Sequence, residues 1–62
     1  MTPEQRAALE AMRDAGGAVP ILAIDHDVMV GLKRMGLITL RRETIEITKK
    51  GREAIAKETK HE

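Results

Sequence analysis

The sequence predicts a small α+β domain that is mostly helical. Two segments carry apolar residues at helical spacing, and glycine follows each of them, at 16–17 and at Gly36. From Leu37 to Thr48, apolar and polar residues alternate on both sides of a short charged stretch, as in a β-hairpin. The expected order is therefore helix, one or two short helices, hairpin, helix.

The first helix is expected to begin at the start of the chain. Thr2 can act as its N-cap, Pro3 suits the first helical position, and Gln5 completes a capping box. One face of this helix is expected to be apolar, formed by the alanines at 8, 11 and 15, Leu9 and Met12. The glycine pair then ends the helix.

The segment 18–35 allows two interpretations. Its apolar residues at helical spacing are Ile21, Ile24, Val28, Leu32 and Met35. Either one helix runs from Pro20 onward, or a short helical turn over 20–24 precedes a second helix that starts at Asp25. Asp25 is a good N-cap and Asp27 suits the first turn of a helix, which favours the second interpretation.

The hairpin prediction includes a register. If residues 41–44 form the loop, Leu40 pairs with Ile45 and Ile38 with Ile47, and all four side chains face the core. Neither central loop residue favours positive φ, so a four-residue loop around a type I turn is expected.

The last helix is expected to follow Thr48, which can act as its cap. Ile55 and the alanines at 54 and 56 supply a modest apolar face. Residues 57–62 are polar, and we expect them to fray. The whole chain, residues 1–62, is expected to form a single domain.

Composition argues against several classes of function. The chain has no Cys for disulfides or thiolate metal sites, and no aromatic residue on which single-stranded nucleic acid could stack. No apolar run approaches the roughly 20 residues of a membrane span, and no signal-peptide pattern is present, so a cytoplasmic protein with no membrane partner is expected. Adjacent helical residues point in different directions, so His26 and its two neighbouring aspartates cannot converge on one ion. We expect no enzyme activity, no metal and no cofactor.

Positive charge is concentrated in one part of the chain. The net charge is +1, but residues 1–32 carry −3, residues 33–52 carry +5, and residues 53–62 carry −1. Such asymmetry bears on the partners of a protein rather than on its fold. The central segment contains three basic pairs, Lys33-Arg34, Arg41-Arg42 and Lys49-Lys50.

Two stretches carry a family resemblance, GLKRMGLI at 31–38 and IEITKKGREAI at 45–55. They resemble the winged helix-turn-helix domains of bacterial, archaeal and phage transcriptional regulators. In that family a recognition helix ends in a leucine-rich turn and "GLI", a wing hairpin follows, and "T-x-K-G-R" begins the next helix. The resemblance covers residues 17–56 and implies a minimal winged helix with a rudimentary or fused second helix and a short wing.

The resemblance implies a small, dimeric, DNA-binding transcriptional regulator that holds double-stranded DNA mainly through its phosphates. If Val28, Leu32 and Met35 face the core, His26 and Val30 turn outward and lie nearest the bases. The implied DNA-binding residues are His26, Val30, Lys33, Arg34, Arg41, Arg42, Lys49 and Lys50.

An alternative is a winged-helix module for protein–protein interaction, with a different partner or with itself, that does not bind DNA. Asp25 and Asp27 flank His26 at the tip of the recognition helix, where phosphates would repel them. Exposed apolar side chains on the same helix suit a protein partner better. The residues of this alternative site are Met29, Val30 and Lys33.

Overall fold

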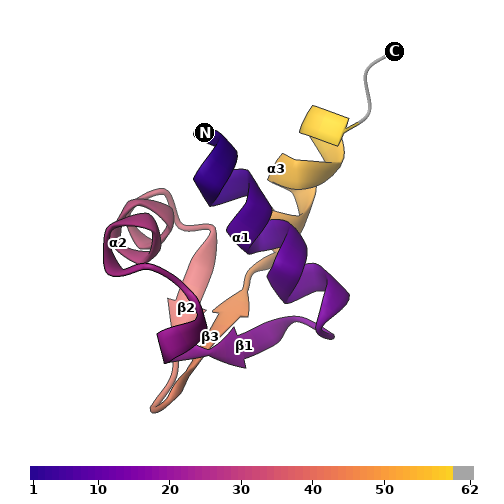
Figure 1. The fold of residues 1–62 in the computed structure, drawn as a ribbon. Coiled ribbons are helices and arrows are strands. Elements are labelled where there is room, and N and C mark those ends of the chain that lie inside the picture. The colour runs from indigo at the N-terminus through magenta and orange to yellow at the C-terminus, as the bar shows by residue number, and fades with distance from the viewer. Residues whose placement is uncertain (60–62) are drawn as a thin grey trace.

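The computed structural model describes the chain over residues 1–59, and its side chains up to residue 57. The structure confirms the predicted α+β, mostly helical class, and the order of its elements is consistent with the predicted winged-helix-like arrangement (Figure 1). The elements are helix α1 (Pro3–Asp14), strand β1 (Ala18–Pro20), the 3₁₀ turn η1 (Ile21–Ala23), helix α2 (His26–Arg34), strands β2 (Ile38–Leu40) and β3 (Thr44–Ile47), and helix α3 (Lys49–Thr59).

The capping box at the start of α1 is confirmed. The Gln5 N–H donates to Thr2 Oγ1 at 3.1 Å, and the Thr2 N–H donates to Gln5 Oε1 at 3.0 Å. Both glycines after the helix have positive φ, as a glycine C-terminus requires. Two of the alanines, Ala11 and Ala15, are exposed, so their predicted place on the buried face is wrong. The buried face is narrower and consists of Ala8, Leu9 and Met12.

The segment after α1 divides as the second interpretation predicts. η1 is a single helical turn, Ile24 has extended backbone, and α2 begins after Asp25 at the N-cap position. The Asp25 side chain makes no capping hydrogen bond, so its backbone rather than its carboxylate marks the start of the helix. Gly36, with φ +75°, ends α2 as predicted.

Strand β1 was not predicted. It pairs antiparallel with β3, with Val19 opposite Ile45 and Pro20 opposite Thr44. β1 is an edge strand in the order β1-β3-β2, and Pro20 is its last residue, a position where a missing N–H is tolerated. The sheet therefore has three strands, with β3 in the centre.

The hairpin register is confirmed, because Leu40 pairs with Ile45 and Ile38 with Ile47. Four residues, 41–44, lie between Leu40 and Ile45, as predicted, and Thr44 also belongs to β3 because it pairs with Pro20 of β1. Within the loop the Arg41 N–H donates to the Thr44 carbonyl at 2.8 Å. Among the described residues only glycines have positive φ, so a type I′ turn is absent from this loop.

The start of α3 is capped by Thr48, whose Oγ1 accepts from the Gly51 N–H at 3.0 Å. Ile55 is buried and Ala54 half-buried, but Ala56 is exposed, contrary to the prediction. α3 continues to Thr59, three residues into the segment expected to fray, and the rest of that segment lies outside the described residues.

The core lies between the three helices and one face of the sheet (Figure 1). Among the described residues it contains only aliphatic side chains and methionine. Because a domain of this size buries a comparatively small part of its surface, its stability depends on the close packing of these side chains. Its buried members are Ala8, Leu9, Met12, Met29, Leu32, Leu37, Ile38, Ile45, Ile47 and Ile55.

Candidate nucleic-acid interface

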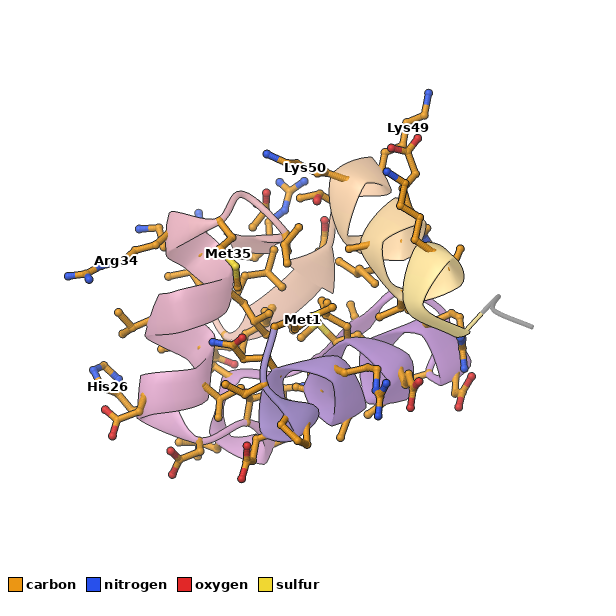
Figure 2. All side chains as sticks on the ribbon, turned by 90° about the horizontal axis from the view of Figure 1, so that it is seen from above. Met1, His26, Arg34, Met35, Lys49 and Lys50 are labelled. Carbon is orange, nitrogen blue, oxygen red and sulfur yellow. The ribbon has the colours of Figure 1, made fainter. Side chains whose placement is uncertain are left out.

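The outer face of α2 carries His26, Val30 and Arg34, which recur every four residues along the helix. His26 and Arg34 are exposed and point away from the body at opposite ends of α2 (Figure 2). Val30 between them is half-buried. The structure therefore brings these three predicted site residues onto one face.

The buried face of α2 differs from the predicted one. Met29 was expected to be exposed but is only 9% exposed and belongs to the core, whereas Met35 was expected inside and is 37% exposed. α2 packs against both α1 and β2, and in this packing Met29 and Leu32 face inward, with Val28 at the border. Met29 therefore cannot serve as a freely exposed contact for a partner.

Three cations gather at the C-terminal end of α2. Lys33 and Arg34 form its last turn. Lys50 extends from α3 over Gly36, and its Nζ lies 3.9 Å from the position that a Cβ on Gly36 would occupy. An ammonium group there is favourable, because the C-terminus of a helix carries partial negative charge. Lys49, although adjacent in sequence, points away from α2 (Figure 2).

The hairpin tip holds Arg41 and Arg42, both exposed. Arg41 Nε lies 3.2 Å from Glu46 Oε1 in a solvent-exposed ion pair. The tip is attached to the body of the domain, because the Ile21 N–H donates to the Glu43 carbonyl at 2.9 Å. The hairpin tip that carries the two arginines therefore lies beside η1, at the end of the hairpin opposite the turn that ends α2 (Figure 1).

A groove of about 420 Å³ lies between α2 and β2, and we call it the α2–β2 groove. Met29, Val30 and Leu40 supply apolar walls, and the other lining residues carry basic side chains. The sequence did not point to Leu40 as a site residue, because alternation along the strand indicated only burial. The full lining is His26, Met29, Val30, Lys33, Arg34 and Leu40.

Gly51 and Arg52, the glycine and arginine of the "T-x-K-G-R" pattern, lie where α3 meets the rest of the domain. A Cβ on Gly51 would overlap the Leu37 carbonyl oxygen, so only glycine allows α3 to approach this closely. The Arg52 guanidinium covers Gly17, with one nitrogen 2.8 Å from the position of a Cβ there. The glycine and arginine of the "T-x-K-G-R" pattern thus have structural roles in this chain.

Comparison with protein-family models, with curated proteins and with solved structures finds no match. Over residues 1–59, no helix is both long enough and apolar enough to cross a membrane. The same part of the chain contains no cluster of three or more His, Asp or Glu side chains that could hold a metal ion. Membership of the winged-helix family of regulators stays a prediction that rests on the two sequence stretches.

Proposed function

We propose that this chain binds double-stranded DNA as a small winged-helix regulator and holds the duplex mainly through its phosphates. The observation that carries the proposal is the gathering of Lys33, Arg34 and Lys50 at one end of α2, from two separate elements. Exposed ammonium and guanidinium groups bind phosphates by releasing condensed counterions, which needs no preformed cavity. The expected dimer and cytoplasmic location belong to the same proposal.

The charges on α2 decide which end of the helix approaches the duplex. Asp25 and Asp27 lie beside His26 at the N-terminal end, whereas Lys33 and Arg34 lie in the last turn. Phosphates repel the carboxylates and attract the basic groups, so the C-terminal half of α2 is the half that meets the backbone. Because phosphate contacts carry no sequence information, we expect only a weak preference for base sequence.

The hairpin tip supplies a second point of contact. Arg42 is exposed, and Arg41 is engaged only in an exposed ion pair with Glu46, which is a weak interaction that phosphate can replace. The tip and the end of α2 are separated by the length of β2, about 10 Å for three residues. Contacts at the hairpin tip and at the end of α2 would therefore reach the phosphates of more than one nucleotide.

The test is a fluorescence-anisotropy titration of the full chain with random-sequence duplex DNA at two salt concentrations. With about four phosphate contacts, raising salt from about 50 to about 200 mM should lower affinity by about 150-fold. No measurable binding at the lower salt, or an affinity that does not change with salt, would reject the proposal.

Two adjacent lysines provide a matched pair of variants. Lys50→Ala removes a charge at the end of α2, and Lys49→Ala removes one that points away from it. Lys50→Ala should weaken binding severalfold and lower the salt slope by about 0.9, the value of one lost phosphate contact. Lys49→Ala should change both quantities much less. Equal effects would mean that only net charge matters, and that the end of α2 is not the contact surface.

A second candidate function is a protein-interaction module that uses the same side of α2, and the α2–β2 groove favours it. A phosphate backbone would leave the apolar walls formed by Met29, Val30 and Leu40 without a matching apolar group. Val30→Ser distinguishes the two functions, because it removes apolar surface but no charge. It should weaken a protein complex while leaving DNA affinity within about twofold.

A further inference from the structure

The α2–β2 groove combines two chemical features that one ligand class would satisfy together. Two of its apolar walls are fixed parts of the domain, because Met29 belongs to the core and Leu40 packs against it, while Val30 is half-buried. Its basic rim consists of exposed groups that stay hydrated until a ligand arrives. An apolar surface with an exposed charged edge is suited to binding apolar groups that have charged groups beside them.

The apolar surface continues past the groove along α2. A second hollow, of about 570 Å³, shares His26 and Met29 with the α2–β2 groove and extends to Ile21 and Leu22. Asp25 also lines this hollow, so it suits the apolar part of a ligand and not its carboxylates. Leu22 is 94% exposed, so it contributes almost nothing to the core of the isolated chain. A ligand that follows α2 from Lys33 toward η1 would remove this leucine from water, which is favourable.

The charge of the rim selects the sign of the ligand. Lys33 and Arg34 line the α2–β2 groove, and no carboxylate is among the described residues that line it. Arg34 presents a planar fork of N–H donors that matches a carboxylate in two-point contact. A ligand with carboxylates beside apolar side chains therefore complements both the walls and the rim, whereas a phosphate backbone complements the rim alone.

We propose that the α2–β2 groove binds an acidic amphipathic segment of a partner protein. Apolar side chains of that segment cover Met29, Val30 and Leu40, and its carboxylates pair with Lys33 and Arg34. This inference rests on the second candidate function and names the chemistry of its partner. Because Lys33 and Arg34 also belong to the proposed DNA surface, the segment and duplex DNA would compete for the chain.

Selection from a library of random peptides tests the proposal without knowledge of the partner. The full chain is immobilised, and peptides of about 12 residues, roughly 18 Å long as a helix, are selected for binding to it. The enriched peptides should have net negative charge and apolar residues at helical spacing. Enrichment of neutral or basic peptides, or no enrichment above background, would overturn the proposal.

Variants show whether an enriched peptide occupies the groove. Val30→Ser and Arg34→Glu should each weaken its binding by about tenfold or more, because they remove apolar contact and charge complementarity respectively. Lys57→Glu is the control, since it makes the same kind of charge reversal at an exposed position on a different element, α3. Circular dichroism of each variant verifies folding, and equal losses in all three variants would contradict binding in the groove.

Spectra of ¹⁵N-labelled protein locate the peptide and separate the two proposals. Signals of Val30, Lys33 and Leu40 should shift on titration with the enriched peptide, and adding duplex DNA should reverse the shifts. If the peptide binds in the groove but DNA does not bind at all, the DNA proposal fails and this one stands. If DNA binds and no acidic peptide is selected, the groove proposal fails and the DNA proposal stands. Shifts of the same signals with protein concentration alone would identify a second copy as the occupant and overturn the proposal.

Discussion

The Thr48 hydroxyl donates a hydrogen bond to the Gly36 carbonyl oxygen at 2.9 Å. The same hydroxyl accepts from the Gly51 N–H at 3.0 Å, and the Thr48 N–H donates to the Leu37 carbonyl at 3.0 Å. One residue therefore ties the turn that ends α2 to the first turn of α3. The position of the candidate DNA-binding helix depends on this joint as well as on its own packing.

Replacing Thr48 tests the joint directly. Thr48→Val keeps the branched shape but removes the hydroxyl, so both side-chain hydrogen bonds are lost and the Gly51 N–H has no cap. We expect a loss of about 1–2 kcal/mol in the free energy of unfolding, measured by urea denaturation. Thr48→Ser retains the hydroxyl and is the control, with an expected loss below about 1 kcal/mol. If Thr48→Val cost no more than Thr48→Ser, the hydrogen bonds of the hydroxyl would contribute no more to stability than the methyl group.

Two helical glycines should respond to alanine in opposite ways. In an ordinary helix interior, replacing glycine by alanine stabilises by about 1 kcal/mol. At Gly51, however, a Cβ would overlap the Leu37 carbonyl oxygen and lie 2.9 Å from Ile47 Cγ1, and neither backbone nor core can readily yield. Overpacking of this kind costs about 1–3 kcal/mol, so Gly51→Ala should destabilise despite the better helix former.

Gly31→Ala is the matched control for that change. A Cβ on Gly31 would lie 2.6 Å from Gln5 Nε2, the far end of a flexible side chain that can rotate away. The gain in helix propensity and the disturbance of the Gln5 capping interaction then nearly cancel, and the change in unfolding free energy should stay within about 1 kcal/mol. Thermal denaturation of both variants measures the difference. If Gly51→Ala were as stable as Gly31→Ala, the close contact of α3 with Leu37 would not be a real constraint.

Local chemistry explains which parts of the fold the sequence could predict. The capping box at Thr2 and the glycine stop at Gly36 depend on neighbouring residues alone, and the hairpin register follows from alternation on both sides of one loop. Strand β1 could not be predicted in this way. Its three residues are too few to show a strand pattern of their own. Its partner β3 follows α2 in the sequence, so the pairing that defines β1 forms only in the folded chain.

The candidate site was less predictable than the fold. The apolar residues of α2 are consistent with several orientations of the helix, and its packing against α1 and β2 selected the one with Met29 inside and Met35 outside. That choice depends on tertiary contacts, because a short helix does not fix its own rotation. Similarly, Lys49 and Lys50 are equivalent in sequence, and only the structure distinguishes the one that reaches Gly36. The basic residues themselves were visible in the charge distribution.

The ion pair at the hairpin tip leads to a prediction of increased DNA affinity. Glu46 lies 3.2 Å from Arg41, so Glu46→Gln removes both a competing partner for Arg41 and a negative charge near the tip. If the tip contacts phosphate, one additional ionic contact should raise affinity by about three- to eightfold at about 0.1 M salt. Because the pair is exposed, the unfolding free energy should change by less than about 1 kcal/mol. Glu53→Gln, at an exposed position of α3, is the control, and an equal increase there would show that the tip makes no contact.

Two leucines on neighbouring elements should differ sharply in their contribution to stability. Leu22 is 94% exposed and Leu32 is fully buried, so only Leu32 contributes its apolar surface to the core. Leu22→Ser should shift the unfolding free energy by no more than about 0.5 kcal/mol, as expected for a surface substitution. Leu32→Ala should lower it by about 2–5 kcal/mol, a large part of the stability of so small a domain. Urea denaturation measures both changes, and a large loss for Leu22→Ser would mean that this leucine is covered in solution by a second copy of the chain.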